Sequence, residues 1–172
     1  MEKIEIKGIN YRLNEETLTA EVIEKGYEGD IIIPETVVFQ EVAYRVTSIR
    51  WSAFLGCKSL TSIVIPDSVT SIGENAFEDC SSLTSIVIPD SVKSIGHCAF
   101  LGCKSLTSMV IPDSVTRIIT AAFYGCKSLT SITFNGTKAQ WQGIKLGKDW
   151  NARCPKITVH CTDGEVEIRM PL

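Results

Sequence analysis

The sequence has no long apolar run. Its longest uninterrupted apolar stretches are four or five residues, whereas a helix needs roughly 20 apolar residues to cross a bilayer. The first 25 residues alternate charged and apolar side chains and contain no apolar run of signal-peptide length. We therefore expect no membrane span and no export signal in the chain as written, and a signal removed earlier would leave the same sequence.

A cluster of basic residues is also lacking. The chain carries 17 Lys and Arg against 20 Asp and Glu, which gives a formal net charge of -3. Residues 1–45 hold five basic and ten acidic side chains, and no segment is densely basic. Nucleic-acid binders need a basic face that displaces counterions from phosphates. The charge pattern therefore predicts that neither DNA nor RNA is a partner.

Motifs for catalysis and metal binding are missing as well. The two histidines stand beside cysteines, as His97-Cys98 and His160-Cys161, and no C-x-x-C or H-x-x-x-H spacing occurs, also not around Cys154. Neighbouring residues on a strand point to opposite faces, so His160 and Cys161 cannot easily share one ion. No Gly-rich phosphate loop or G-x-S-x-G motif is present. We expect no metal, no cofactor and no enzymatic activity.

An internal repeat dominates what is there. Three nearly identical copies of 23 residues follow one another at Leu60 to Ser82, Leu83 to Ser105 and Leu106 to Ser128. A half copy precedes them at Val46 to Ser59, and another follows at Leu129 to Phe134. Such a period is the signature of a solenoid, in which each copy makes one turn of a spiral.

Each copy contains an L-x-x-L-x-L spacing that predicts a short strand. Leu60, Ile63 and Ile65 are expected to face the core, whereas Ser62 and Val64 point outward. Pro66 ends the strand because it has no N–H for the ladder. The remainder of the copy predicts a second short strand and then one helical or 3₁₀ turn at Ala-Phe-x-x-Cys, with Phe77 and Cys80 turned inward. One copy cannot shield its own core, so neighbouring copies must stack.

Both ends of the stack need covers. Ile31-Ile32-Ile33-Pro34 predicts an earlier strand, separated from its coil by an insertion near Val38 to Tyr44. Residues 3 to 23 alternate apolar and polar side chains around Asn14 to Thr17, which indicates a hairpin. At the other end a second hairpin is predicted from Ile157 to Met170, closed at Asp163-Gly164. Further apolar cover is expected from four residues of the last segment: Ala139, Trp141, Ile144 and Trp150.

The repeated sequence SIVIPDSVTSIGENAFEDC resembles the BspA-like leucine-rich repeat family. The resemblance rests on Ile-Pro after the strand, Ile-Gly before the turn and Ala-Phe-x-x-Cys at the end of each coil, and it covers residues 31 to 134. Arg50 and Ile119 stand where the pattern has Gly, and Met109 replaces a core Ile. The fold we expect is an α/β repeat solenoid, a right-handed leucine-rich-repeat spiral of 23-residue coils with hairpin caps. It forms a single domain over residues 1–172, with a cap at 1–30, repeats at 31–134 and a cap at 135–172.

The same resemblance implies a class of function. Members of the family are typically bacterial or protist proteins of the cell surface, and some act as adhesins that bind host matrix proteins. We therefore expect a secreted or cell-surface interaction protein with a protein partner, although a cytoplasmic location stays open. The alternative is a structural or spacer unit that has no specific ligand.

The seven cysteines have a largely structural explanation. Cys57, Cys80, Cys103 and Cys126 recur at the repeat period. Stacked coils hold Cα atoms about 4.8 Å apart, which a disulfide can bridge, but side chains stacked in register run parallel and fit a disulfide poorly. Buried free thiols are the favoured reading, and cross-linking of the ladder is the alternative. The sequence leaves open whether Cys154 and Cys161 are paired.

Two outer surfaces are candidates for a partner. On the strands the outward positions form a Ser ladder and an apolar ladder that contains Val64, Val87 and Val110. The alternative is that these are simply residues that favour strands. The positions beside Ala-Phe vary between copies and include large apolar side chains of the kind that anchor interfaces. These rim residues are Trp51, Leu55, Leu101 and Tyr124.

Overall fold

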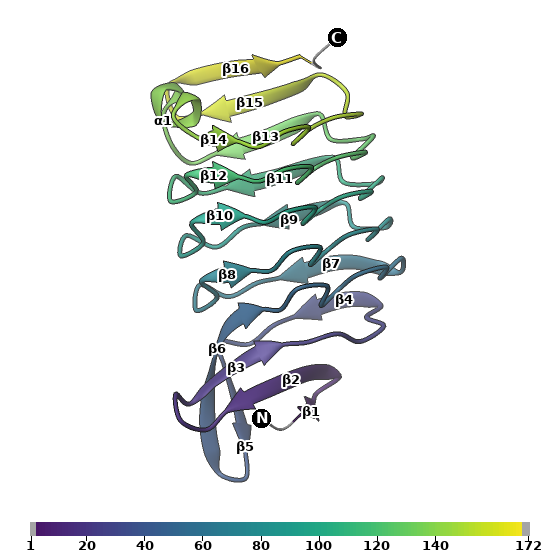
Figure 1. Ribbon diagram of the computed structural model, residues 1–172, viewed down its shortest axis with the longest axis vertical. Coiled ribbons are helices and arrows are strands. Elements are labelled where there is room, and N and C mark those ends of the chain that lie inside the picture. The colour runs from purple at the N-terminus through teal and green to yellow at the C-terminus, as the bar shows by residue number, and fades with distance from the viewer. Residues whose placement is uncertain (1–2, 170–172) are drawn as a thin grey trace.

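The computed structural model describes residues 3–169, and it stacks the repeats into an elongated solenoid (Figure 1). The first strands of successive coils lie parallel along one side, which we call the strand face. They are β4 (Gly29–Ile32), β7 (Leu60–Val64), β9 (Ser85–Val87), β11 (Ser108–Ile111), β13 (Ser131–Phe134) and β15 (Ile157–Cys161). In register, Ser85, Ser108 and Ser131 are neighbours. The predicted strand before Pro34 is confirmed as β4, which pairs with β7.

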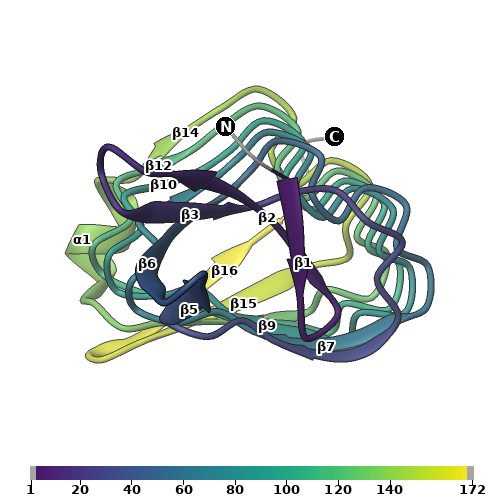
Figure 2. The same ribbon diagram turned by 90° about the horizontal axis from the view of Figure 1, so that it is seen from below.

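A second column of short strands forms another side of the spiral, as the view along the stack shows (Figure 2). Its members are two residues long: β8 (Ser71–Ile72), β10 (Ser94–Ile95), β12 (Arg117–Ile118) and β14 (Lys145–Leu146). The predicted second strand of each coil is thus confirmed. The chain then returns to the strand face through the Ala-Phe-x-x-Cys segment, which forms the remaining side of the coil.

The prediction of a helical or 3₁₀ turn in this segment is wrong. The backbone makes consecutive turns, with left-handed residues before Ala and again four residues later, as at Asn75 (φ 57) and Asp79 (φ 57). A helix would direct every N–H back along its own chain. Here Phe77 N–H instead donates to Ala99 O of the next coil at 2.8 Å. Hydrogen bonding between coils therefore replaces a helix.

Side chains of all coils share one apolar core. Four phenylalanines, Phe54, Phe77, Phe100 and Phe123, are fully buried and form a ring stack with centroids 5.0 to 5.5 Å apart. The Cys of each coil lies beside this stack and is buried too. Burying such side chains contributes roughly 1.5 to 3 kcal/mol each. The predicted inward positions of Phe77 and Cys80 are confirmed.

A three-stranded meander covers the first coil. Its strands are β1 (Lys3–Ile6), β2 (Ile9–Asn14) and β3 (Thr19–Val22). They pair antiparallel, so the predicted hairpin is present and has an additional strand. The predicted insertion forms a hairpin of β5 (Thr36–Phe39) and β6 (Val42–Ile49), whose tip projects beyond the coils (Figure 1).

The last coil contains the only α-helix of the described residues, α1 (Lys138–Gln142), which begins with a capping box at Thr137. Trp141, Ile144 and Trp150 are buried as predicted, whereas Ala139 lies exposed on α1. A hairpin of β15 and β16 (Gly164–Ile168) closes the stack. The end predicted for this hairpin, Met170, lies outside the described residues. No helix in the described part is long and apolar enough to cross a membrane.

Candidate protein-binding surfaces

The strand face brings the three predicted valines together. Val87 and Val110 are neighbours in register, and Val64 continues the row on β7. Val64 is 56% exposed and Val87 60%, and Val110 is partly exposed. Neighbouring residues on a strand point to opposite faces. Ile63 and Ile86, which precede Val64 and Val87 on their strands, face the core, so the valines face outward.

Sequence reasoning missed one member of this row. Ile32 pairs with Val64 and is 71% exposed. The sequence did contain a signal for the outward position of Ile32, because Ile32 stands two residues before Pro34, as Val64 does before Pro66. With it, four β-branched side chains line up across four coils. We call Ile32, Val64, Val87 and Val110 the apolar row.

Polar groups bound the apolar row. Asp30, two residues before Ile32, accepts hydrogen bonds from Ser62 Oγ at 2.6 Å and Thr61 Oγ1 at 2.9 Å. These hydroxyls hold the pKa of the Asp30 carboxyl below its usual range, so it stays charged at neutral pH. At the other end Thr133 follows Val110 in register on β13, and His160 follows Thr133 on β15, where its Nδ1 lies 3.0 Å from Glu165 Oε1. The apolar row is thus uncharged between two polar ends.

The predicted rim residues form two patches rather than one. Trp51 is 59% exposed, with the Arg50 guanidinium 4.8 Å above its ring, and Leu55 is exposed in the same turn. Leu101 and Tyr124 occupy equivalent positions in successive coils and are partly exposed. Between Leu55 and Leu101 the same position holds Glu78, which Asn75 Nδ2 contacts. A carboxylate therefore separates the two apolar patches.

The second patch is partly covered by a cation. The Arg153 guanidinium lies 5.2 Å from the centroid of the Tyr124 ring. Stacking of this kind contributes about 0.5 to 1 kcal/mol at exposed sites and reduces the free area of the ring. Arg50 covers Trp51 in the same way, but Trp51 is 59% and Leu55 50% exposed, whereas Leu101 and Tyr124 are only partly exposed. The Trp51 and Leu55 patch therefore offers the larger apolar anchor.

The repeated cysteines are free in the structure, and six of the seven are buried. Cys80 Sγ donates to Phe54 O at 3.1 Å, and Cys103 Sγ donates to Phe77 O at 3.1 Å. Burial raises the pKa of the Cys80 thiol to about 12. Cys154 is buried and Cys161 is partly exposed, and they do not bond to each other. Protonated, enclosed thiols of this kind are inert.

Of the two adjacent His–Cys pairs in the sequence, His97 and Cys98 contact each other, whereas His160 lies against Glu165. Cys98 Sγ lies 3.4 Å from His97 Nε2, and His97 Nδ1 lies 3.0 Å from Thr120 O. Burial, and then the carboxylates of Glu78 and Glu74, raise the pKa of the Cys98 thiol. An activated nucleophile needs the opposite shift. The pair therefore lacks the electrostatics of a catalytic dyad.

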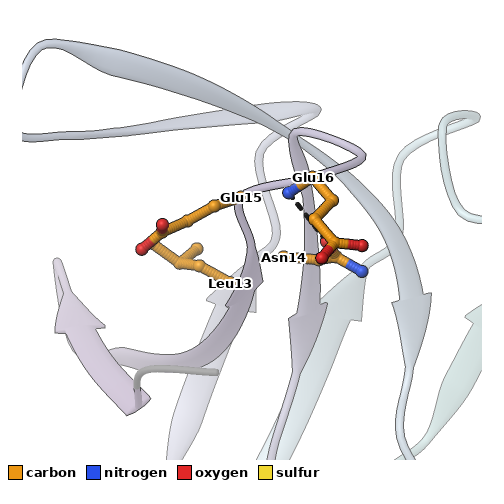
Figure 3. A pocket seen from close by; sticks show the side chains of 4 residues that line it. All are labelled: Leu13, Asn14, Glu15 and Glu16. Carbon is orange, nitrogen blue, oxygen red and sulfur yellow. Dashed lines mark hydrogen bonds between the residues drawn. The ribbon is translucent and has the colours of Figure 1, made fainter.

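One hollow of the described surface lies at the turn after β2 and has no recognisable ligand chemistry. It has a volume of about 300 Å³ and is lined by Leu13, Asn14, Glu15 and Glu16 (Figure 3). Asn14 Oδ1 accepts from Glu16 N–H at 3.0 Å, which satisfies the turn itself, and the two carboxylates point apart. Within residues 3–169 no three His, Cys, Asp or Glu side chains are placed to hold a metal ion.

Comparison with known proteins agrees with this architecture. The pattern described as BspA type leucine rich repeat region matches residues 38–145 in six copies. A leucine-rich repeat protein from Bacteroides ovatus is 36% identical over 84% of this chain, with a TM-score of 0.68. The pneumococcal vaccine antigen PcpA is 20% identical over 95% of this chain, with a TM-score of 0.65. A leucine-rich repeat protein from Bacteroides capillosus is 20% identical over 94% of the chain, with a TM-score of 0.52.

The lengths of these proteins differ. The chain spans 40% of the Bacteroides ovatus protein and 50% of PcpA, but 99% of the Bacteroides capillosus protein. No curated protein matches the chain at a significant level. The two neighbours at 20% identity share the fold alone. Because the six-copy match extends over more than half of the residues and the Bacteroides ovatus protein is 36% identical, the chain belongs to the BspA type leucine-rich repeat family.

Proposed function

We propose that the chain is a non-catalytic module that binds a protein partner, as an adhesion or interaction protein that is secreted or displayed at the cell surface. Leucine-rich repeat proteins of this family are suited to protein interaction. The location follows from the resemblance, since members of the family are typically surface proteins. The partner class we favour is a host matrix protein or another surface protein.

The observation that carries the proposal is the exposure of the apolar row. Ile32, Val64 and Val87 are each more than half exposed, and the core is filled by the opposite faces of their strands. β-branched side chains favour strands whatever they face, but Thr would serve a strand as well, so strand formation alone does not require Val or Ile at these outward positions of four successive coils. A contiguous apolar row of this kind is what a partner can cover.

The strand face alone is too small for a specific interface. Five or six strands about 4.8 Å apart, each showing some 15 Å of length, give roughly 400 Å². A standard interface needs about 800 Å² per partner. The partner must therefore reach a flank, and the Trp51 and Leu55 patch is the one we choose. Leu55 lies five residues before Leu60, where β7 begins, so the Leu55 end of this patch is the one toward the strand face, whereas Trp51 follows β6, which pairs with β8 of the second column.

The test is a binding screen with immobilised protein against matrix proteins and glycans. For any ligand found, Trp51→Ala combined with Leu55→Ala is expected to weaken binding at least about tenfold, because a few large anchors such as Trp supply much of the energy. The melting temperature should change little, since both side chains lie outside the core. Leu146→Lys, on the second strand column, is the matched surface control.

Two outcomes would redirect the proposal. If the double variant binds normally and Val87→Lys abolishes binding, the strand face is the whole site. If nothing in the panel binds at micromolar concentration, the alternative of a spacer unit without a specific ligand is favoured.

A further inference from the structure

The outer strands of the described sheets differ in how they are protected against further pairing. β1 carries Lys3 and Glu5, β4 carries Asp30, and β16 carries Glu165 and Glu167. Charged side chains of this kind discourage the addition of another strand. β5 has the sequence Thr-Val-Val-Phe and no charged residue. It is the edge of its sheet, since it pairs with β6 alone.

The backbone of β5 has free hydrogen-bonding groups on its outer side. β5 and β6 are joined by the two residues Gln40 and Glu41, and Val46 N–H donates to Glu35 O at 2.8 Å. Antiparallel pairs alternate between bonded and non-bonded residues. Val37 and Phe39 therefore bond to β6, and the N–H and C=O groups of Thr36 and Val38 point away from it.

An apolar groove of about 440 Å³ runs along this open edge. It lies between β5, the end of β4 and the β1–β2 hairpin, and its lining includes Ile6, Ile9, Ile32 and Val38. Ile32 is 71% and Val38 61% exposed. The groove is thus apolar and open to water beside unpaired backbone groups, which is the arrangement that strand addition uses.

The charges around the groove favour a positively charged binding segment. Residues 1–45 carry ten acidic and five basic side chains. Exposed carboxylates flank both ends of β5, Glu35 before it and Glu41 after it. Asp30 precedes Ile32 on β4, and Glu15 lines a hollow with Gln40 of the β5–β6 turn. Two cations stand against these four acids, Lys7 in the groove lining and the exposed Arg45, the register partner of Thr36. A second copy of the chain would bring two acidic ends together. A positively charged segment would be attracted.

We propose that β5 binds an extended, basic segment of another protein as an added strand. Its backbone pairs with Thr36 and Val38, its apolar side chains enter the groove beside Ile32 and Val38, and its Lys or Arg side chains lie near Glu35 and Glu41. This site is at the N-terminal end of the solenoid (Figure 1). It shares Ile32 with the apolar row, but it includes neither Trp51 nor Leu55 and does not depend on a partner at that patch.

The probe is a synthetic peptide of alternating Val and Lys residues, compared with one of alternating Val and Glu. The basic peptide should bind the full chain, and its affinity should fall as salt is added. Hydrogen exchange should slow at the amides of Thr36 and Val38 when the peptide is bound. Those of Val37 and Phe39, already bonded to β6, should change little.

Two variants of one residue separate backbone pairing from charge. Val38→Pro removes an N–H that β6 does not use, and Val38→Lys keeps the N–H but places a positive charge in the groove. Each substitution should lower the affinity for the basic peptide at least about tenfold. The Leu146→Lys variant should bind this peptide as tightly as the natural chain does. Circular dichroism and the thiol protection of the core cysteines establish that each variant is folded.

Three results would overturn the proposal. One is equal binding of the acidic and basic peptides, or no binding of the basic one. A second is binding that leaves exchange at Thr36 and Val38 unchanged. The third is a dimer of the chain that Val38→Pro abolishes in sedimentation experiments, because the occupant of β5 would then be a second copy.

Discussion

The rings of Phe77 and Phe100 lie parallel, with an interplanar angle of 3° and centroids 5.3 Å apart. The stack extends from Tyr27 in the first cover to Trp150 in the last coil. Each ring is therefore packed between the rings of two neighbouring coils, and it couples those coils directly.

Removing one ring should be costly. Phe100→Ala is expected to lower the free energy of unfolding by about 3 to 5 kcal/mol, because the cavity would open between two stacked rings. Chemical denaturation provides the measurement. Leu55→Ala, at an exposed position, should change the free energy of unfolding by less than about 0.5 kcal/mol. A loss below about 1 kcal/mol for Phe100→Ala would place this ring outside the cooperative core.

The thiols should report the integrity of the stack. In native buffer we expect Cys161, the partly exposed thiol, to react quickly, and the six buried cysteines to react only after denaturant is added. Titration with a thiol reagent followed by mass spectrometry distinguishes the residues. The cross-linked ladder would be supported instead if mass spectrometry revealed disulfides among Cys57, Cys80, Cys103 and Cys126.

Alkaline pH should weaken the packing of the N-terminal cap on the first coil, where the Tyr27 ring contacts Phe54. Tyr27 Oη donates to Ile23 O at 2.7 Å, and burial raises the pKa of Tyr27 to about 12. The unfolded value is about 10. The neutral, buried phenol therefore contributes stability that is complete below about pH 10 and is lost as the pH rises through about 12. The raised pKa of Cys80 acts in the same direction.

The measurement is the denaturant midpoint as a function of pH from about 9 to about 12. Tyr27→Phe should be somewhat less stable at neutral pH, since it loses a hydrogen bond of about 1 kcal/mol, and its midpoint should fall less steeply with pH. A slope identical to that of the natural chain would exclude Tyr27 as a source of the alkaline sensitivity.

Glycine should be required in some coils and replaceable in others. A Cβ at Gly73 would overlap the backbone of Trp51 and lie 2.7 Å from Arg50 C, whereas at Gly96 the nearest atom, Gly73 O, would be 3.3 Å away. We expect Gly73→Ala to destabilise by about 1 to 3 kcal/mol through overpacking. Gly96→Ala is the matched control and should cost less. Equal melting temperatures for the two variants would contradict this account.

The strands could be predicted from the sequence because each of them repeats a simple alternation of inward and outward residues. Leu60, Ile63 and Ile65 had to face a common core, and the copies 23 residues apart fixed how coils stack. The caps were also predictable, since their alternation is that of a hairpin. Ile32 escaped notice because an insertion separates its strand from the next coil, although its distance from Pro34 identified it.

The turns were mispredicted for a physical reason. Phe77 and Cys80 are three residues apart, a spacing that fits a helical turn and consecutive turns equally well. The difference lies in the left-handed backbone of Asn75 and Asp79. The residue types held a signal, because Gly56, Gly102 and Gly125 occupy the position of Asp79, and Gly, Asn and Asp adopt this conformation most readily. The rim residues form two patches because Glu78 occupies the equivalent position in the coil between them. This separation depends on how the coils are stacked, and the spacing within one copy does not show it.

The hydrogen bonds between the turns all run in one direction. Three N–H groups of each turn donate to carbonyls of the following coil, as Ser52, Phe54 and Gly56 do to Glu74, Ala76 and Glu78, and the pattern recurs up to the last coil. On the other sides of the coils the direction is reversed, since Thr116 N–H donates to Lys93 O and Ile119 N–H to Ile95 O of the preceding coil. An inner coil therefore donates N–H groups to both of its neighbours, from its turn to the following coil and from around its second strand to the preceding one. The dipoles of these peptides, about 3.5 D each, oppose one another, so added coils lengthen the solenoid without the one-directional alignment of peptides that an α-helix has.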